Sequence, residues 1–529
     1  MTNIAESSTP EASNALRKEV ISVGRYSLVY LIGQAVSRAV GFLMIPLYTQ
    51  YIAPGNYGAM ELIEILTGAF LMIISMGVGD SMSRFYYTEK DEEGRNKVIS
   101  TIVVGFGLLG IPIVLLLVAV APWIARIVLE EERFAFYLQI TIGTAWFGML
   151  CDVGFTYLQM RYMAKTFVAV TLLQLVAALS LNIYFITRLE QGILGVFYST
   201  LITQAATGLI LVTVIISKVG WLVSPAHLRK LIGFGLPLVP PQIGLMLGFS
   251  SNRFFLRWYG AADPAMALAQ VGIFSLGHKF GVIVNRFINV PFNSFWSPRR
   301  FELLLRDEPH ARETVARMCT YGTLCSVSFA LVLSACIAPV VALMAESSYH
   351  ACWMIVPLVA LAYIATGLET HFKTGILFRR KTLWDTWIGL LALAVIIGWN
   401  WVFVPRYGLM GAATSNLAGF AVRVTLVYFV SQKLYPIPFE MRRIATMLLV
   451  AIGLYFVSQM ITFHSMWLTG FARAATAALF PFVLLLVRFY HEGELEFVRT
   501  TVHQVWQTKI RKRLVPSRIG EAVQSLEST

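Results

Sequence analysis

Long apolar runs separated by short polar connections fill the chain between residues 25 and 487. A helix needs roughly 20 apolar residues to cross a bilayer, and each run is close to that length. The pattern therefore predicts an all-α integral membrane protein with about fourteen transmembrane helices. The expected spans cover residues 25–51, 58–83, 98–120, 134–158, 166–187, 193–216, 232–258, 270–296, 314–344, 353–376, 382–403, 408–432, 444–462 and 466–487.

A sequence repeat relates the first six spans to the next six. Gly192 at the entry to span six and Gly408 at the entry to span twelve are 216 residues apart, and Gly58 and Gly272 at the entries to spans two and eight are 214 apart. Nearly equal offsets indicate two copies in one orientation, as in many transporters, although an old duplication without moving parts would leave the same pattern. The expected parts are a cytoplasmic tail (1–24), an N-lobe (25–217), a C-lobe (218–432), a final helix pair (433–487) and a basic tail (488–529).

The composition agrees with a membrane protein. Hydrophobic residues make up 57% of the chain, the mean hydropathy is +0.68, and charged residues make up only 13%, compared with about 25% in soluble domains. The excess of 42 Lys and Arg over 29 Asp and Glu is spread among the apolar runs. We therefore do not expect a nucleic-acid partner.

Basic residues gather in alternate connections. Lys and Arg groups follow each even-numbered span from two to twelve, whereas the opposite loops hold only Arg126, Arg133, Arg188, Arg257 and Arg406. Because Lys and Arg in short loops stay in the cytoplasm, both termini are expected there. The basic, amphipathic stretch after span fourteen is typical of a helix lying on anionic lipid, or of a segment that binds a partner.

Several basic residues fall inside the expected spans and need a compensating partner, because each costs about 2.5–3.5 kcal/mol at the bilayer centre. Lys279 and Arg286 are seven residues apart, on one helical face, and Arg38 and Arg253 are related by the repeat. We predict that these four and Arg423 line a central cavity and bind a phosphate-bearing ligand. The alternatives are ion pairs between helices and, for Arg253, a side chain that reaches the membrane surface.

Carboxylates are fewer than cations in the spans. Asp152 and Glu369 differ by nearly the repeat offset and are candidates for a coupling proton or for ion pairs with the cavity cations. A local pair of Glu369 with Lys373 is the simpler alternative. Glu61 and Glu64 are expected near the membrane interface.

Three prolines lie early in span seven. Pro237, Pro240 and Pro241 remove backbone donors and should kink or unwind the helix. The bend is a candidate gating hinge, and a static kink is the alternative. No metal or cofactor motif is apparent, and we read the five cysteines as free thiols.

Five short motifs resemble one transporter family. They read PLYTQYIAPGNYG (46–58), LPLVPPQ (236–242), NRFFL (252–256), VGIFSLGHKFG (271–281) and PFNSFWSPRRFE (291–302). In order and spacing they resemble the polysaccharide-biosynthesis transporters, the Wzx-type oligosaccharide flippases of the multidrug/oligosaccharidyl-lipid/polysaccharide exporter superfamily. Asn252 departs from the resemblance, since family members often have Asp there.

The resemblance implies two six-helix lobes in a V around a central cavity, in a bacterial cytoplasmic membrane. It also implies the cargo, an isoprenoid-diphosphate-linked oligosaccharide flipped for surface polysaccharide assembly, with membrane lipids and polysaccharide polymerase or glycosyltransferase machinery as the other partners. The final helix pair resembles that of peptidoglycan-precursor flippases, so that cargo stays an alternative.

We therefore expect a transporter and not an enzyme. An ion-coupled multidrug exporter of the same fold is a rival, but cationic drugs favour carboxylates and here cations predominate. A membrane glycosyltransferase or ligase is a second rival. Such an enzyme generally needs a larger extracytoplasmic loop or paired catalytic carboxylates, and neither is apparent in the sequence.

Overall fold

The computed structural model describes residues 41–306, 308–494 and 496, and their regular elements are all helices. Twelve of these helices are long and apolar enough to cross a membrane, and a bent pair, Ser347–Met354 with Val356–Phe378, makes a thirteenth. They match the predicted spans two to fourteen one by one. Of the first predicted span, only residues 41–51, including helix α2 (Ile45–Tyr51), lie in the described part.

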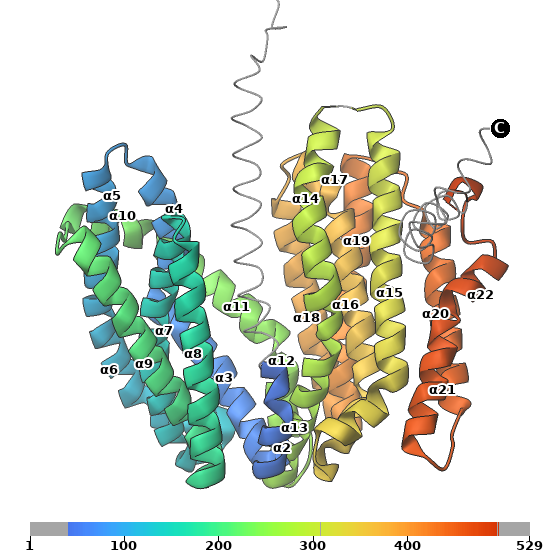
Figure 1. The fold of residues 1–529 in the computed structure, drawn as a ribbon, viewed down its shortest axis with the longest axis horizontal. Coiled ribbons are helices and arrows are strands. Elements are labelled where there is room, and N and C mark those ends of the chain that lie inside the picture. The colour runs from blue at the N-terminus through green and yellow to red at the C-terminus, as the bar shows by residue number, and fades with distance from the viewer. Residues whose placement is uncertain (1–40, 307, 495, 497–529) are drawn as a thin grey trace, which may run out of the picture. The chain divides into compact units, whose positions relative to one another are not determined.

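The helices fall into two units, each described by itself. The first unit comprises residues up to 286 and 340–436. Its main α-helices, labelled in Figure 1, are α3 (Pro54–Ser75), α4 (Val78–Thr88), α5 (Glu92–Ser100), α6 (Gly107–Ile124), α7 (Ala135–Met160), α8 (Ala164–Ile183), α9 (Gly192–Val219), α10 (Pro225–Gly235), α11 (Val239–Phe249), α12 (Ser251–Tyr259), α13 (Pro264–Gly281), α16 (Val356–Phe372), α17 (Thr374–Phe378), α18 (Leu383–Tyr407) and α19 (Leu409–Leu434). This unit thus holds helices from both expected lobes.

The second unit comprises residues 287–339 and those from 437 onward. Its helices are α14 (Val290–Leu305), α15 (Ala311–Met344, which extends into the first unit), α20 (Met441–Met460), α21 (Met466–Ala478) and α22 (Phe480–Leu486). The expected lobe boundaries at residues 217 and 432 stay a prediction.

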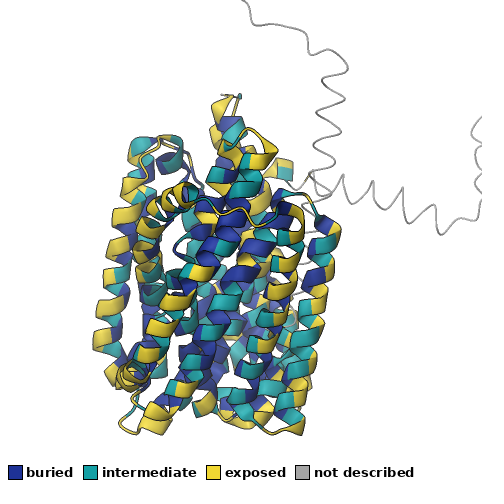
Figure 2. Ribbon diagram, turned by 90° about the vertical axis from the view of Figure 1, so that its left-hand side faces the viewer, coloured by how far each residue is buried: buried dark blue, intermediate teal, exposed yellow. Residues whose placement is uncertain are grey.

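Exposed and buried positions alternate around the helices (Figure 2). Large apolar side chains such as Leu115, Trp387 and Phe482 are more than half exposed. In water such a surface would be unfavourable, but lipid chains are as apolar as these side chains. The exposed faces therefore support a membrane environment.

Helices α3 and α13 approach each other at two glycines that the sequence repeat had paired. A methyl group on Gly58 would lie 2.9 Å from the nitrogen of Gly272 and would overlap the carbonyl oxygen of Leu268. A methyl group on Gly272 would lie 3.1 Å from the nitrogen of Gly58. Glycine is required here because any side chain would push the two backbones apart. Repeat-related positions thus face each other, as expected at the axis that relates two copies.

The seventh predicted span is broken, as its prolines predicted. The α-helical backbone of α10 changes to a 3₁₀ turn at Leu236–Leu238, which contains Pro237, and Pro240 and Pro241 lie in the first turn of α11. Their missing N–H groups cost little at a helix start. A second break at Ser250 separates α11 from α12.

The two ends of this broken span contact different helices. At one end Gly235 of α10 touches the turn at Met76 and Gly77, which separates α3 from α4 and has a left-handed backbone, with φ of 72° at Gly77. At the other end α12 packs against α13, α18 and α19. The span therefore connects the expected N-lobe helices with the C-lobe helices, and the hinge role of its prolines stays a prediction.

Candidate functional site

Lys279 forms an ion pair with a carboxylate from another helix. Its Nζ lies 2.5 Å from Oε1 of Glu61 on α3 and donates a 2.8 Å hydrogen bond to the hydroxyl of Tyr57. Tyr57 is fully buried and Glu61 is only 6% exposed. The crossing of α3 and α13 thus brings Glu61 to Lys279, and its expected place near the membrane interface stays a prediction.

Arg253 is buried beside the same stretch of α13. Its Nε donates a 3.0 Å hydrogen bond to Ser275, one helical turn before Lys279, and its guanidinium stacks 5.2 Å from the ring centre of Phe274. The Asn252 side chain accepts a 3.4 Å hydrogen bond from Arg253. Since Arg253 is only 7% exposed, the alternative of a side chain reaching the membrane surface is wrong.

Arg286 lies in an irregular part of the same span. The α-helix ends at Gly281, and Asn285–Asn289 form a π-helical turn that precedes α14. The Arg286 side chain is exposed and makes no hydrogen bond or ion pair within the described ranges. The assumption of one continuous α-helical face for Lys279 and Arg286 is therefore wrong. Single π-turns are frequent at functional sites, and this one carries an unpaired cation.

Arg423 belongs to a different cluster, formed by α16, α18 and α19. Its Nε lies 3.0 Å from Oε1 of Glu369 and its Nη2 lies 3.1 Å from Oδ1 of Asp385, and Lys373 Nζ lies 2.5 Å from Oδ2 of Asp385. Two cations and two carboxylates thus balance. Glu369 takes Arg423 as its ion-pair partner, and Lys373 takes Asp385, so the local pair expected between Glu369 and Lys373 is replaced. The arrangement agrees with the ion-pair alternative for Arg423.

Asp152 lies outside the ion pairs of these clusters. Asp152 lies on α7, where its side chain is exposed and has no ion pair with a described residue. Arg38 lies outside the described residues. The structure thus brings together Lys279 and Arg253 around α13, with Arg286 further along the same span, and places Arg423 with Glu369.

Arg257 was read from the sequence as a loop residue, but it is 1% exposed at the end of α12. Its Nε and Nη2 donate hydrogen bonds of 3.0 and 2.6 Å to the carbonyl of Leu129, and its Nη1 donates one of 2.8 Å to Pro264. Its Nη2 also lies 3.3 Å from Oε2 of Glu130. Arg257 therefore fixes the loop after span three to α12, and only its position near a span end could have hinted at this.

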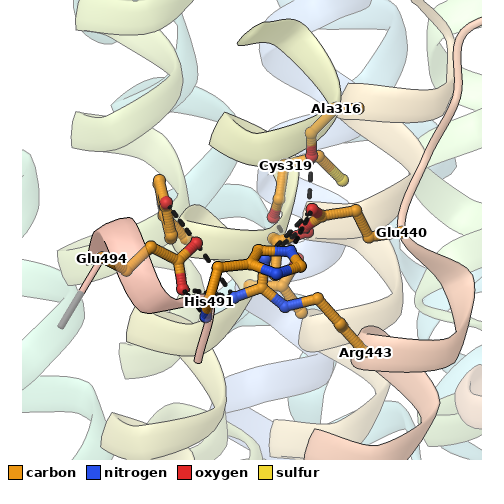
Figure 3. Close-up of polar contacts among 9 residues, drawn as sticks. Ala316, Cys319, Glu440, Arg443, His491 and Glu494 are labelled. Atoms are coloured by element: carbon orange, nitrogen blue, oxygen red, sulfur yellow. Dashed lines mark hydrogen bonds and ion pairs between the residues drawn. The ribbon is translucent and has the colours of Figure 1, made fainter. Parts of the chain in front are cut away.

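In the second unit, a cluster of charges fixes the segment after α22 (Figure 3). Arg443 lies 2.9 Å from Oε2 of Glu440 and 2.8 Å from Oε2 of Glu494. Glu494 also accepts a 2.6 Å hydrogen bond from the Tyr321 hydroxyl and a 2.9 Å hydrogen bond from the His491 backbone. Burial alone would raise the pKa of Glu494, but these donors hold it below the usual value. The basic stretch that follows lies outside the described residues.

Arg473 and the cysteines are not part of these ion pairs. Arg473 donates to the carbonyl of Ile461, beyond the end of α20, as suits a residue outside the repeat. The five cysteines are all free, as expected.

Comparisons with known proteins find relatives over much of the chain. A family model described as "Polysaccharide biosynthesis protein" matches residues 23–304. Lsg locus protein 1 of Haemophilus influenzae is 21% identical over 271 residues. That alignment covers 50% of this chain and 63% of the relative, so it spans less than two thirds of the relative's length.

Solved transporters share the fold. The lipid II flippase MurJ in an inward closed conformation aligns with a TM-score of 0.69 over 88% of this chain and 100% of that chain, at 13% identity. An inward-facing multidrug resistance MATE family transporter of the MOP superfamily aligns with a TM-score of 0.55 over 75% of this chain and 94% of that chain, at 15% identity. At these identities the likeness concerns the fold alone. It confirms the predicted fold class, an all-α protein with many membrane-spanning helices arranged as in these transporters.

Proposed function

The chain belongs to the polysaccharide biosynthesis protein family, and from this premise we propose that it flips an isoprenoid-diphosphate-linked oligosaccharide from the inner to the outer leaflet. The observation that carries the proposal is a group of cations within membrane helices. Arg253, Lys279 and Arg286 all fall within 34 residues of chain, inside the region that the family model matches. A diphosphate is the anionic part of such a cargo.

Fixed cations suit this cargo for a physical reason. A diphosphate loses hydrating water when it enters the membrane, which is costly unless charged donors replace that water. Lys279 has three N–H donors, of which Glu61 and Tyr57 take two in the described part of the chain. Arg286 is exposed and has five donors without a described partner. These two side chains are therefore the ones most available to phosphate oxygens.

The proposed orientation follows from the basic loops. We place the ends of α4, α5 and α10, with Arg84, Lys97 and Arg229, in the cytoplasm. The start of α3 and α13 then lies at the outer surface of a bacterial cytoplasmic membrane. Outward movement of negative charge is favoured by an inside-negative potential, by about 2.3 kcal/mol per charge per 100 mV.

A peptidoglycan precursor is the second candidate cargo. The observation that favours it is the alignment to the lipid II flippase over the whole of that chain. Such a precursor also carries a lipid diphosphate, so the same cations would serve it, and only the sugar would differ. A cationic drug fits less well, because Glu61, Glu369 and Asp385 are already paired with Lys and Arg.

Binding of a short isoprenoid-diphosphate oligosaccharide to purified protein tests the proposal. Arg286→Gln is the sharpest variant, because no described ion pair is broken by it. Loss of a charged hydrogen bond should weaken binding about 10- to 100-fold. Lys279→Ala and Arg38→Ala should also weaken it, with unfolding measured for each. Arg406→Ala, at an exposed arginine in the last turn of α18, is the matched control and should bind as wild type does. Equal binding by all variants, or no binding by wild type, would contradict the proposal.

A further inference from the structure

The ion pair between Lys279 and Glu61 joins helices from the two halves of the repeat. Glu61 lies on α3, one turn beyond Gly58, and Lys279 lies on α13, two turns beyond Gly272. The two helices run in the same direction, because Gly55 lies near Ala265 and Gly58 near Leu268. The ion pair thus lies just beyond the glycine contact between α3 and α13, further along both helices.

Two further contacts lie at the end where α3 and α13 begin. Arg257, near the start of α13, bonds the carbonyl of Leu129, as described above. The Tyr349 hydroxyl donates a 2.6 Å hydrogen bond to the carbonyl of Ile52, just before α3. In the proposed orientation this is the outer end. Within the first unit, these contacts therefore hold α3 and α13 together at the end where both begin.

The two side chains of the ion pair differ in their solvent exposure. The side chain of Lys279 is 32% exposed, whereas that of Glu61 is 8% exposed. An anion can therefore reach the ammonium, but Glu61 cannot turn to water while α3 and α13 stay together. Glu64, one turn further along α3, is exposed and has no ion pair with a described residue.

We infer that the diphosphate of the cargo takes the place of Glu61 on Lys279 and so releases the contact between α3 and α13. This inference rests on the proposed function. Once displaced, Glu61 would be a buried carboxylate without a partner, which is strongly unfavourable. Separation of α3 from α13 lets Glu61 reach water. Opening of the outer end is thereby tied to the presence of cargo.

Spin labels at Glu190 and Arg406 report this opening. The two positions are exposed and related by the repeat offset of 216 residues, one in each half. The labels are placed as Glu190→Cys and Arg406→Cys in a chain whose five native cysteines are replaced, and the distance is measured by double electron–electron resonance. The probes are geranylgeranyl diphosphate and, as the matched lipid without phosphate, geranylgeraniol.

The expected results separate the ion pair from the cargo site. In wild type, the diphosphate should lengthen the distance and the alcohol should not. Glu61→Gln should give the long distance without ligand and bind the diphosphate about tenfold tighter, since Lys279 no longer has to leave a carboxylate. The exchange Glu61→Lys with Lys279→Glu should restore the short distance, which shows that the fold is intact. Glu132→Gln, at an exposed glutamate paired with Arg126, should behave as wild type does.

Two results overturn the inference in distinguishable ways. If wild type binds the diphosphate but Glu61→Gln keeps the wild-type distance and affinity, the ion pair does not control opening, and the proposed function stands. If wild type fails to bind the diphosphate, the proposed function fails, and the role of cargo in breaking the ion pair fails with it.

Discussion

Replacing Glu369 with glutamine removes one charge from the balanced cluster of Arg423, Glu369, Asp385 and Lys373. The side chains of Glu369 and Arg423 are 12% and 15% exposed, so water can replace little of the lost interaction. Removing one partner of a buried pair costs about 3–5 kcal/mol. Here Asp385 still lies 3.1 Å from Arg423, so we expect a loss of about 2–3 kcal/mol in the free energy of unfolding.

Equilibrium unfolding in mixed detergent micelles, followed by the fluorescence of the 12 tryptophans, measures this loss. The double variant Glu369→Leu with Arg423→Leu should be destabilised by about 2 kcal/mol less than the sum of the single variants, because the two side chains interact directly. Glu313→Gln is the control. Its side chain is 55% exposed, and its effect should stay within about 0.5 kcal/mol.

The same variant separates two roles of Glu369. If Glu369 carries a coupling proton, Glu369→Gln abolishes transport driven by a pH gradient and leaves stability nearly unchanged. If it balances Arg423, stability falls and diphosphate binding by the folded protein stays as in wild type. A change in unfolding free energy below about 0.5 kcal/mol would refute the ion-pair reasoning.

Three further predictions concern other contacts. Gly272→Ala should lower the unfolding free energy by about 1–3 kcal/mol, because the added methyl group overlaps α3. Gly244→Ala is the control: no atom lies within 4 Å of the added carbon, so the unfolding free energy should change by less than about 1 kcal/mol. Equal effects of the two substitutions would contradict the close contact between α3 and α13. Arg257→Met leaves the Leu129 carbonyl without its donor and should lower the unfolding free energy by about 2–4 kcal/mol in the same assay. An effect as small as that of Arg406→Met would contradict the role of Arg257 in fixing the loop after span three. Because the pKa of Glu494 is lowered by folding, its contribution is present above the ordinary pKa of a glutamate and is lost as the pH falls through the lower folded-state pKa. Glu494→Gln should therefore be less stable than wild type at neutral pH and equally stable at the acidic end, and a difference that persists unchanged into strong acid would contradict this sign.

The spans were predictable because few backbone conformations are stable in lipid. A crossing segment must satisfy its own backbone, so it is a helix of sufficient apolar length. The repeat was also visible, because Gly58 and Gly272 are needed where the two backbones touch. The prolines of span seven signalled its break through their missing donors.

The partners of the charges could not be predicted in the same way. Which carboxylate meets Lys279 depends on how α3 crosses α13, and Glu61 is 218 residues away in the chain. Asp385 lies near the start of α18 and gave no sign of its pairing with Arg423. The π-turn that holds Arg286 arises from local backbone geometry that helical periodicity does not encode.

Flipping of a fluorescent isoprenoid-diphosphate oligosaccharide in sealed proteoliposomes tests the central claim most directly. We predict that wild type moves the labelled lipid between leaflets, that the rate of outward movement rises with an inside-negative potential, and that Arg286→Gln abolishes movement while Arg406→Ala does not. Movement no faster than in protein-free vesicles, or equal movement by wild type and Arg286→Gln, would contradict the account.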